Sequence, residues 1–107
     1  GFSYLAKKAH DHGSRIYGAT IMPCGNTEYS EKWMQAFEKT RRDVNQWIRT
    51  QSVYDGYFDF DDILKNDTVP AYLKEEVHIG DGLHPNTMGG KILAECVDLS
   101  MLTGLDD

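Results

Sequence analysis

The hydrophobic positions near the start of the chain follow two patterns, one helical and one extended. Helical spacing connects Phe2, Leu5, Ala6 and Ala9. Gly13 follows them at a position where glycine often ends a helix. The segment from Ile16 to Met22 is then a nearly continuous apolar run that ends at Pro23. Such a run is typical of a strand buried on both faces, so it predicts a parallel sheet.

A longer amphipathic pattern occupies the middle of the chain. Ser30 is a suitable N-cap for a helix that extends to about Thr50. The apolar stripe of this helix consists of Trp33, Phe37, Val44, Trp47 and Ile48. Glu38 and Arg42 are four residues apart and predict an ion pair on the solvent side. The helical spacing of the two tryptophans favours packing in the core over a sugar-binding platform.

The second half of the chain predicts shorter elements. A strand is expected over 57–60, followed by an acidic corner, and short helical turns are expected over 63–77, around Pro70. The acidic corner comprises Asp59, Asp61 and Asp62. A closing helix begins after Pro85-Asn86. Its apolar side consists of Met88, Ile92, Leu93, Cys96 and Leu99.

The order of these elements is helix, strand, helix, strand, turn and helix. This alternation indicates an α/β fold with a parallel sheet and helices on its faces. Parallel strands normally lie within larger sheets, because a lone pair would leave a long unpaired edge. The sequence therefore predicts that residues 1–107 are the C-terminal part of a larger α/β domain. Its open edge should bind the missing N-terminal half or a second copy of the chain.

The charge distribution excludes several classes of partner. The net charge is −6, and the basic residues are scattered apart from Lys7-Lys8 and Arg41-Arg42, so neither nucleic acid nor an anionic membrane surface is expected. No apolar stretch approaches the length of a membrane span. Cys24 and Cys96 could form one bridge or remain two free thiols, which leaves the cellular compartment open.

The strongest chemical signal is the segment from Gly80 to Asn86, which places Asp81 three residues before His84 in a glycine-punctuated turn. The carboxylate can fold back onto one imidazole nitrogen and leave the other as a general base. An ordinary capped turn is the alternative interpretation. The flanking glycines, Pro85 and the α/β order favour catalysis.

Other polar residues support weaker hypotheses. The three aspartates of the acidic corner lack the spacing of a calcium loop, so a solvated corner or a helix cap is favoured over a metal site. His10 and His12 are two residues apart and should be solvent-exposed rather than metal-bound. His78 lies close to Asp81, and a surface position is favoured over a role at the site. A nucleophilic Cys24 stays open without a supporting motif. The sequence predicts no cofactor and no metal.

The residues from Asp81 to Asn86, followed by Gly89 and Gly90, resemble the last conserved block of the SGNH (GDSL-type) hydrolases. The resemblance also covers 9–13, 17–23, 42–49 and 58–60. It implies the C-terminal portion of a flavodoxin-like, three-layer α/β/α fold and a serine esterase mechanism. His84 would act as general base, Asp81 would orient it, and the substrate would be an ester of a small, acetyl-like acyl group. The chain is also similar to a subfamily of secreted esterases found near polysaccharide-degrading enzymes, which implies an acylated carbohydrate and a secreted protein.

The sequence departs from this family at three positions of the site. The family's serine lies in an N-terminal G-D-S block, and its oxyanion-hole glycine and asparagine lie in two further blocks. The serines Ser3, Ser14, Ser30, Ser52 and Ser100 lack this context, and Gly25-Asn26 lacks the aspartate that should follow. We therefore expect the chain to be inactive alone. Two alternatives remain: a non-catalytic packing or interaction module, and, as a distant third hypothesis, a metal-dependent phosphoesterase at the acidic corner.

Overall fold

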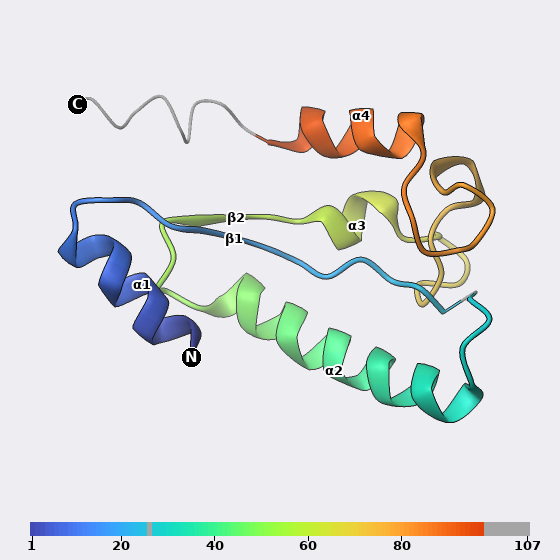
Figure 1. Cartoon of the computed structure of the whole chain (residues 1–107), viewed down its shortest axis with the longest axis horizontal. Coiled ribbons are helices and arrows are strands. Elements are labelled where there is room, and N and C mark those ends of the chain that lie inside the picture. Colours follow the sequence, from blue (N-terminus) through green and yellow to red (C-terminus); the bar gives the residue numbers. More distant parts are fainter. Residues whose placement is uncertain (26, 98–107) are drawn as a thin grey trace.

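The computed structural model describes residues 1–25 and 27–97 (Figure 1), so Asn26, Leu99 and Ser100 lie outside the described residues. The described elements are α1 (Phe2–Asp11), β1 (Tyr17–Ala19), α2 (Glu31–Thr50), β2 (Gly56–Phe58), α3 (Phe60–Leu64), the 3-10 helix η1 (Glu75–Val77) and α4 (Thr87–Cys96). The predicted alternation of helices and strands is confirmed, and the turns expected over 63–77 are the end of α3 and η1.

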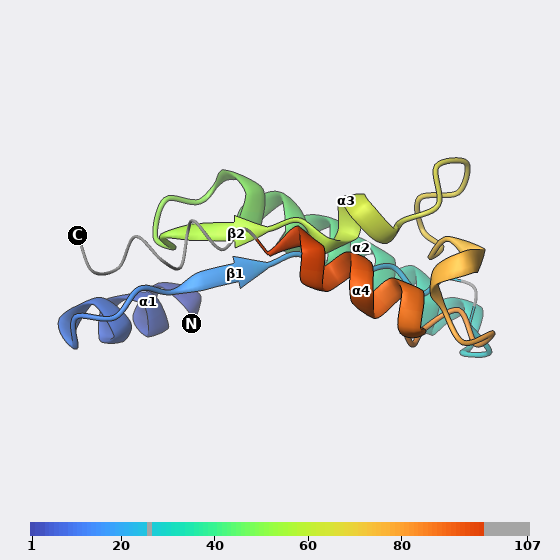
Figure 2. The ribbon, with the colours of Figure 1, turned by 90° about the horizontal axis from the view of Figure 1, so that it is seen from above.

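The two strands pair in parallel, with Gly18 opposite Tyr57. The crossover between them passes through α2, as a parallel connection requires. Figure 1 shows α1 and α2 on one side of the strands and α4 on the other, which is a three-layer α/β/α arrangement. In Figure 2, seen from above, α4 lies over the stretch that follows the carboxyl ends of the strands. The predicted fold class is thus confirmed.

Both strands are shorter than the sequence predicts, because polar side chains replace the strand ladder. Beyond Ala19 the backbone N–H of Ile21 donates to Oδ1 of Asn45 at 2.7 Å, and Nδ2 of Asn45 donates to the carbonyl of Ile21 at 2.9 Å. This amide on α2 therefore satisfies the groups that a neighbouring strand would pair. At the second strand, Asp59 caps α3, so Phe60 begins a helix and does not continue the strand.

The long helix α2 begins where the sequence predicts. The hydroxyl of Ser30 accepts a hydrogen bond from the backbone N–H of Trp33 at 3.2 Å. Ile48 is buried, but Trp33 is 44% exposed, so core packing of this tryptophan was a wrong prediction. Its ring stacks on Phe37 with 5.3 Å between ring centroids. The two polar residues Arg41 and Asn45 lie on the buried face beside Ile48. Asp61 and the backbone of Ile21 are their partners from distant segments.

The predicted pair of Glu38 and Arg42 is present at 3.3 Å, although Glu38 is mostly buried. Its carboxylate turns mainly toward Arg41, with contacts of 2.6 Å and 2.8 Å. Burial disfavours the charged form of Glu38, but hydrogen bonds from Arg41 outweigh it and hold the pKa of this carboxyl below its ordinary value. The contact between Glu38 and the exposed Arg42 is therefore added to a more buried ion pair between Glu38 and Arg41.

The hydrophobic core lies between α3, η1 and α4, at the carboxyl ends of the strands. Its fully buried residues are Leu64, Leu73 and Val77, with Met22, Ile63, Ile92 and Leu93 packed around them. Several apolar side chains of α1 remain exposed, among them Phe2, Tyr4 and Leu5. Because η1 and α4 both pack on this core, the core supports the turn between them, which carries Asp81 and His84.

Within residues 1–25 and 27–97, no helix is long and apolar enough to cross a membrane.

Candidate functional site

The turn between η1 and α4 is closed by backbone hydrogen bonds at both ends. The N–H of Ile79 donates to the carbonyl of His84 at 3.0 Å, and the N–H of Asn86 donates to the carbonyl of Val77 at 2.8 Å. Gly80 and Gly82 have φ values of 108° and 71°, which side chains of other residues adopt with strain. The predicted turn with two glycines is therefore confirmed, and it brings the ends of residues 77–86 together.

The carboxylate of Asp81 holds the imidazole of His84 within this turn. Oδ1 accepts the backbone N–H groups of Leu83 and His84, both at 2.9 Å, and Oδ2 lies 2.5 Å from Nδ1 of His84. The hydrogen bond from the imidazole, followed by the two backbone bonds, holds the pKa of Asp81 far below its ordinary value. An ionised carboxylate only accepts, so Nδ1 carries the hydrogen, and in the neutral imidazole Nε2 keeps a free lone pair.

The imidazole of His84 faces solvent. Its side chain is 67% exposed, compared with 37% for Asp81. Within the described part of the chain, no side chain hydrogen-bonds Nε2. The geometry therefore offers an oriented base on an accessible surface, which is what a proton transfer to or from a bound molecule requires.

Asn86 joins the turn to the helix that follows. Its Oδ1 accepts the N–H of Gly89 at 2.8 Å and caps α4, while Nδ2 donates to the carbonyls of Glu76 and His78 at 2.9 Å and 3.2 Å. Gly89 is buried against η1, and a Cβ atom built there would lie 2.4 Å from the carbonyl oxygen of Val77. The helix therefore approaches the backbone of η1 closely and fixes where the turn begins and ends.

His78 is half-buried at the start of the turn, so the predicted surface position was only partly right. Nδ1 of its imidazole accepts the backbone N–H groups of Gly80 at 3.0 Å and of Gly82 at 3.1 Å. The sequence suggested nearness to Asp81 but gave no sign of this bonding, because the contact depends on the positive φ of both glycines. His78 supports the turn and does not contact the imidazole of His84.

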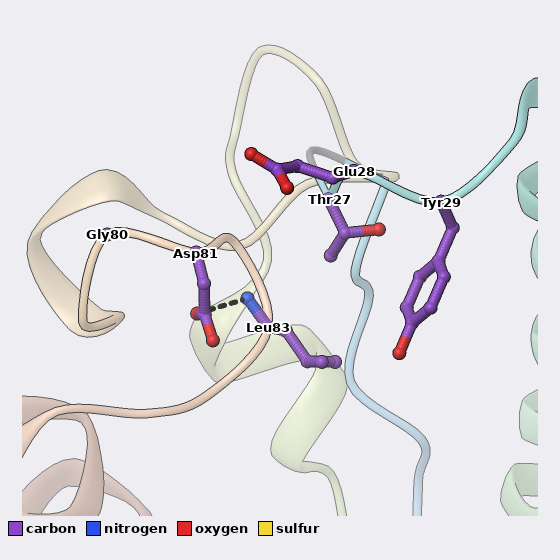
Figure 3. A pocket seen from close by; sticks show the side chains of 6 residues that line it. All are labelled: Thr27, Glu28, Tyr29, Gly80, Asp81 and Leu83. Carbon is purple, nitrogen blue, oxygen red and sulfur yellow. Dashed lines mark hydrogen bonds between the residues drawn. The ribbon is translucent and has the colours of Figure 1, made fainter.

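A cavity of about 670 Å³ lies beside Asp81. Its lining residues are Thr27, Glu28, Tyr29, Gly80, Asp81 and Leu83. In Figure 3 the segment from Thr27 to Tyr29 lies on one side of the cavity and Gly80 and Asp81 lie on the other. The first segment belongs to the loop that follows β1, so the cavity lies toward the carboxyl ends of the strands. Ligand sites of open α/β sheets are found at this edge.

Two of the three aspartates of the acidic corner, Asp59 and Asp61, belong to a partly buried ionic network, while Asp62 is 65% exposed. Two nitrogens of Arg49 contact Asp59 at 2.7 Å and 2.8 Å, and Arg49 also contacts Asp61 at 2.9 Å. Arg41 binds Asp61 from the other side. Burial disfavours the charged form of Asp59, but hydrogen bonds from Arg49 and Thr20 outweigh it and lower the pKa of this carboxyl. The predicted helix cap at Asp59 is confirmed, whereas Asp61 is 4% exposed, so a solvated corner was wrong there.

The remaining candidates do not join the site. His10 hydrogen-bonds Asp55 through Nε2 at 2.9 Å, and His12 is exposed at the end of α1. Cys24 and Cys96 are free thiols. Burial raises the pKa of the Cys24 thiol, which opposes formation of a nucleophilic thiolate. Within the described residues, no group of three or more His, Cys, Asp or Glu side chains could hold a metal ion.

Comparison with known proteins identifies a similar fold but no sequence family. No protein-family model and no curated protein matches the chain. A crystal structure of a candidate acylhydrolase from Bacteroides fragilis is similar over 97% of this chain, with a TM-score of 0.58 and 11% sequence identity. The match covers 50% of that protein, so the present chain spans half its length. The chain thus shares the α/β fold of half of that protein.

Proposed function

We propose that the chain is the C-terminal half of a serine ester hydrolase domain of the SGNH type. The observation that carries the proposal is the contact of 2.5 Å between Nδ1 of His84 and Oδ2 of Asp81, on an imidazole that is 67% exposed. The similarity to half of a candidate acylhydrolase supports a larger domain, because the other half of that fold has no counterpart in this chain.

The mechanism assigns His84 the role of proton carrier. Nε2 takes the proton of a serine hydroxyl from the other half of the domain while the serine oxygen bonds to the ester carbonyl carbon. The carboxylate of Asp81 stabilises the imidazolium that forms. Nε2 then gives this proton to the leaving alcohol as the ester C–O bond breaks. A water molecule, deprotonated in turn by Nε2, then bonds to the acyl carbon. The acyl–serine C–O bond breaks to release the acid, and Nε2 returns the proton to the serine oxygen.

The substrate class rests on the resemblance of residues 81–90 to the family block. This resemblance favours a substrate in which small acyl groups such as acetyl are esterified to a carbohydrate. It also favours a secreted protein. The cavity beside Asp81 supports a bound alcohol group, because Tyr29 adds an aromatic wall and Thr27 and Glu28 add polar groups. These groups lie on the side of the cavity opposite Asp81 (Figure 3).

A non-catalytic packing module is the second candidate. The observation that favours it is the exposure of Phe2, Tyr4 and Leu5 on α1, which are 50%, 59% and 55% exposed. Apolar residues gathered on one helix are a suitable contact for another protein segment. Such a module would bind its missing half or a second copy of the chain through this helix and the open sheet edge, with no turnover.

The two candidates differ in their activity toward a short-chain activated ester such as p-nitrophenyl acetate. We expect the chain alone to show almost no turnover, and the chain joined to or mixed with the upstream segment of its reading frame to hydrolyse the ester. His84→Ala should remove that activity, and His12→Ala, at an exposed histidine far along the chain, should not. Robust turnover by the chain alone that His84→Ala abolishes would contradict the half-domain proposal. Binding of the upstream segment with no turnover in the assembled complex would favour the packing module, and turnover that is unaffected by His84→Ala would contradict the assignment of His84 as the base.

A further inference from the structure

A second histidine holds the backbone on both sides of Asp81. Nδ1 of His78 accepts the N–H of Gly80 at 3.0 Å and the N–H of Gly82 at 3.1 Å. These are the residues immediately before and after Asp81. A nitrogen that accepts two N–H groups carries no hydrogen itself, so the hydrogen of a neutral His78 is on Nε2.

The two halves of the turn are held by different side chains. The carboxylate of Asp81 accepts from residues 83 and 84 and has no bond to the glycine N–H groups. Gly82 is buried, and its N–H would be unsatisfied without His78. A buried N–H without an acceptor is unfavourable, so the turn would open to solvate it. His78 therefore fixes the backbone from which the Asp81 side chain extends.

We propose that His78 is a positioning residue for the Asp81–His84 pair and acts as a hydrogen-bond acceptor through Nδ1. Among the described residues no hydrogen bond joins its imidazole to that of His84, so its effect passes through the backbone at Gly80 and Gly82. The structural part of this inference is independent of enzyme activity. Only its consequence for turnover rests on the proposed function.

A matched pair of variants separates the acceptor from the bulk of the side chain. In His78→Asn, Oδ1 of the amide is attached to Cγ as Nδ1 is, and asparagine commonly accepts the N–H two residues ahead in an Asx turn. His78→Leu has nearly the same shape as His78→Asn but no acceptor. A packing role would make these variants behave alike, whereas an acceptor role makes them differ.

The first measurement is NMR of the purified chain with ¹⁵N-labelled histidine. We expect the ¹⁵N shifts of wild-type His78 to show an unprotonated Nδ1, and the strongly bonded proton between His84 and Asp81 to give a downfield signal. His78→Asn should keep that signal and His78→Leu should lose it, while the indole signal of Trp47 stays unchanged. A hydrogen on Nδ1 of neutral wild-type His78 would overturn the proposal even if His78→Leu fails to fold. An unchanged His84 signal in a folded His78→Leu would also overturn it.

The second measurement is turnover of the assembled domain. A displacement of about 1 Å at a reacting group can lower the rate about 10²-fold, so His78→Leu should lower kcat by roughly that factor with little change in KM. His78→Asn should restore kcat to within a few-fold of wild type. Equal loss in both variants would contradict the acceptor role. An inactive wild-type assembly would reject the proposed function, while the NMR result would still decide the role of His78.

Discussion

Two regions of the molecule pair carboxylates with basic side chains, and the partners differ in kind and in exposure. In the buried network, Asp61 and Arg41 are 5% and 4% exposed. In the turn, Asp81 and His84 are 37% and 67% exposed. A guanidinium keeps its proton at every ordinary pH, so the network is a permanent set of ion pairs. Imidazole is the side chain most suited to proton transfer at neutral pH, so of these two regions the turn is the one proposed for acid–base chemistry.

The two regions also differ in how far apart their members lie along the chain. Asp81 and His84 are three residues apart, and their contact follows from one local turn. The network joins Arg41 to Asp61 over 20 residues and Thr20 to the backbone N–H of Asp61 over 41 residues. It therefore connects α2 to the carboxyl ends of both strands. The range of its contacts gives the network a structural role, whereas chemistry at the turn stays a proposal.

The largest effect should come from replacing either member of the turn in the assembled hydrolase. His84→Ala removes the base, and Asp81→Asn presents an amide N–H that stabilises the wrong imidazole tautomer, so each should lower kcat by about 10⁴-fold. Circular dichroism should show little change in folding, since His84 is exposed. Arg42→Ala, in an exposed ion pair elsewhere, is the control and should leave kcat unchanged. Near-normal kcat in His84→Ala would show that the Asp81–His84 contact has only a structural role, as the ion pairs of the network do.

Removing a member of the buried network should have the largest effect on stability. Arg41→Met keeps much of the side-chain volume but leaves the buried Asp61 with one cation fewer, and breaking such a pair costs about 3–5 kcal/mol. Urea denaturation would measure the loss in the free energy of unfolding. Lys39→Ala breaks a pair whose side chains are 80% and 65% exposed and should change stability far less, because solvent screens this pair. Similar small losses in both variants would show that the network does not hold the fold together.

The same difference in range explains which features the sequence predicted. Helix α2 and its cap at Ser30 depend on neighbouring residues, and both are confirmed. The contact of Asp81 with His84 is equally local, so its residues could be found from spacing and glycines alone. Its catalytic role stays a prediction, as does the assignment of residues 1–107 to one half of a domain.

Features that depend on distant polar partners were not predictable. The sequence gives no sign that Asn45 would bond the backbone of Ile21, and this contact shortens β1. It also places Asp61 in an acidic corner without indicating that Arg41 and Arg49 neutralise it. Helical periodicity assigned Trp33 to the core, while the buried face of α2 is occupied by charged and amide side chains. An apolar pattern cannot reveal a core position filled by a polar residue.

Adjacent glycines in α4 offer a smaller and more local test of the turn. A Cβ at Gly89 would lie 2.4 Å from a backbone oxygen of η1, whereas a Cβ at Gly90 would meet nothing within 4 Å. Gly89→Ala should therefore destabilise the chain by about 1–3 kcal/mol, as overpacking does. Gly90→Ala should stabilise it by up to about 1 kcal/mol, because alanine favours helix. Thermal denaturation of both variants would measure this, and equal shifts would show that α4 does not rest on η1.

The smallest effect concerns acid sensitivity, to which both regions contribute with the same sign. Burial opposes the charge of Asp59, but hydrogen bonds from Arg49 and Thr20 keep its pKa in the folded chain below the ordinary value. Hydrogen bonds from His84 and from the backbone lower the pKa of Asp81 in the same way. In the unfolded chain an aspartate titrates near about 3.9. As the pH falls toward this value, the unfolded chain binds protons that the folded chain does not yet bind. The stability that the two carboxylates contribute is therefore present above this pH and is lost as the pH falls through their folded pKa.

Asp59 should contribute more to this loss than Asp81, because its side chain is 28% exposed, compared with 37% for Asp81, and solvent screens its ion pair less. We expect the urea midpoint of the wild type to fall as pH drops from neutral to acidic values. Asp59→Asn should flatten this dependence more than Asp81→Asn does, and Asp62→Asn, at a side chain that is 65% exposed, is the control. A larger flattening in Asp81→Asn would mean that the exposed turn also contributes substantially to stability. Both regions would then stabilise the fold, and they would differ only in the proton transfer proposed for the turn.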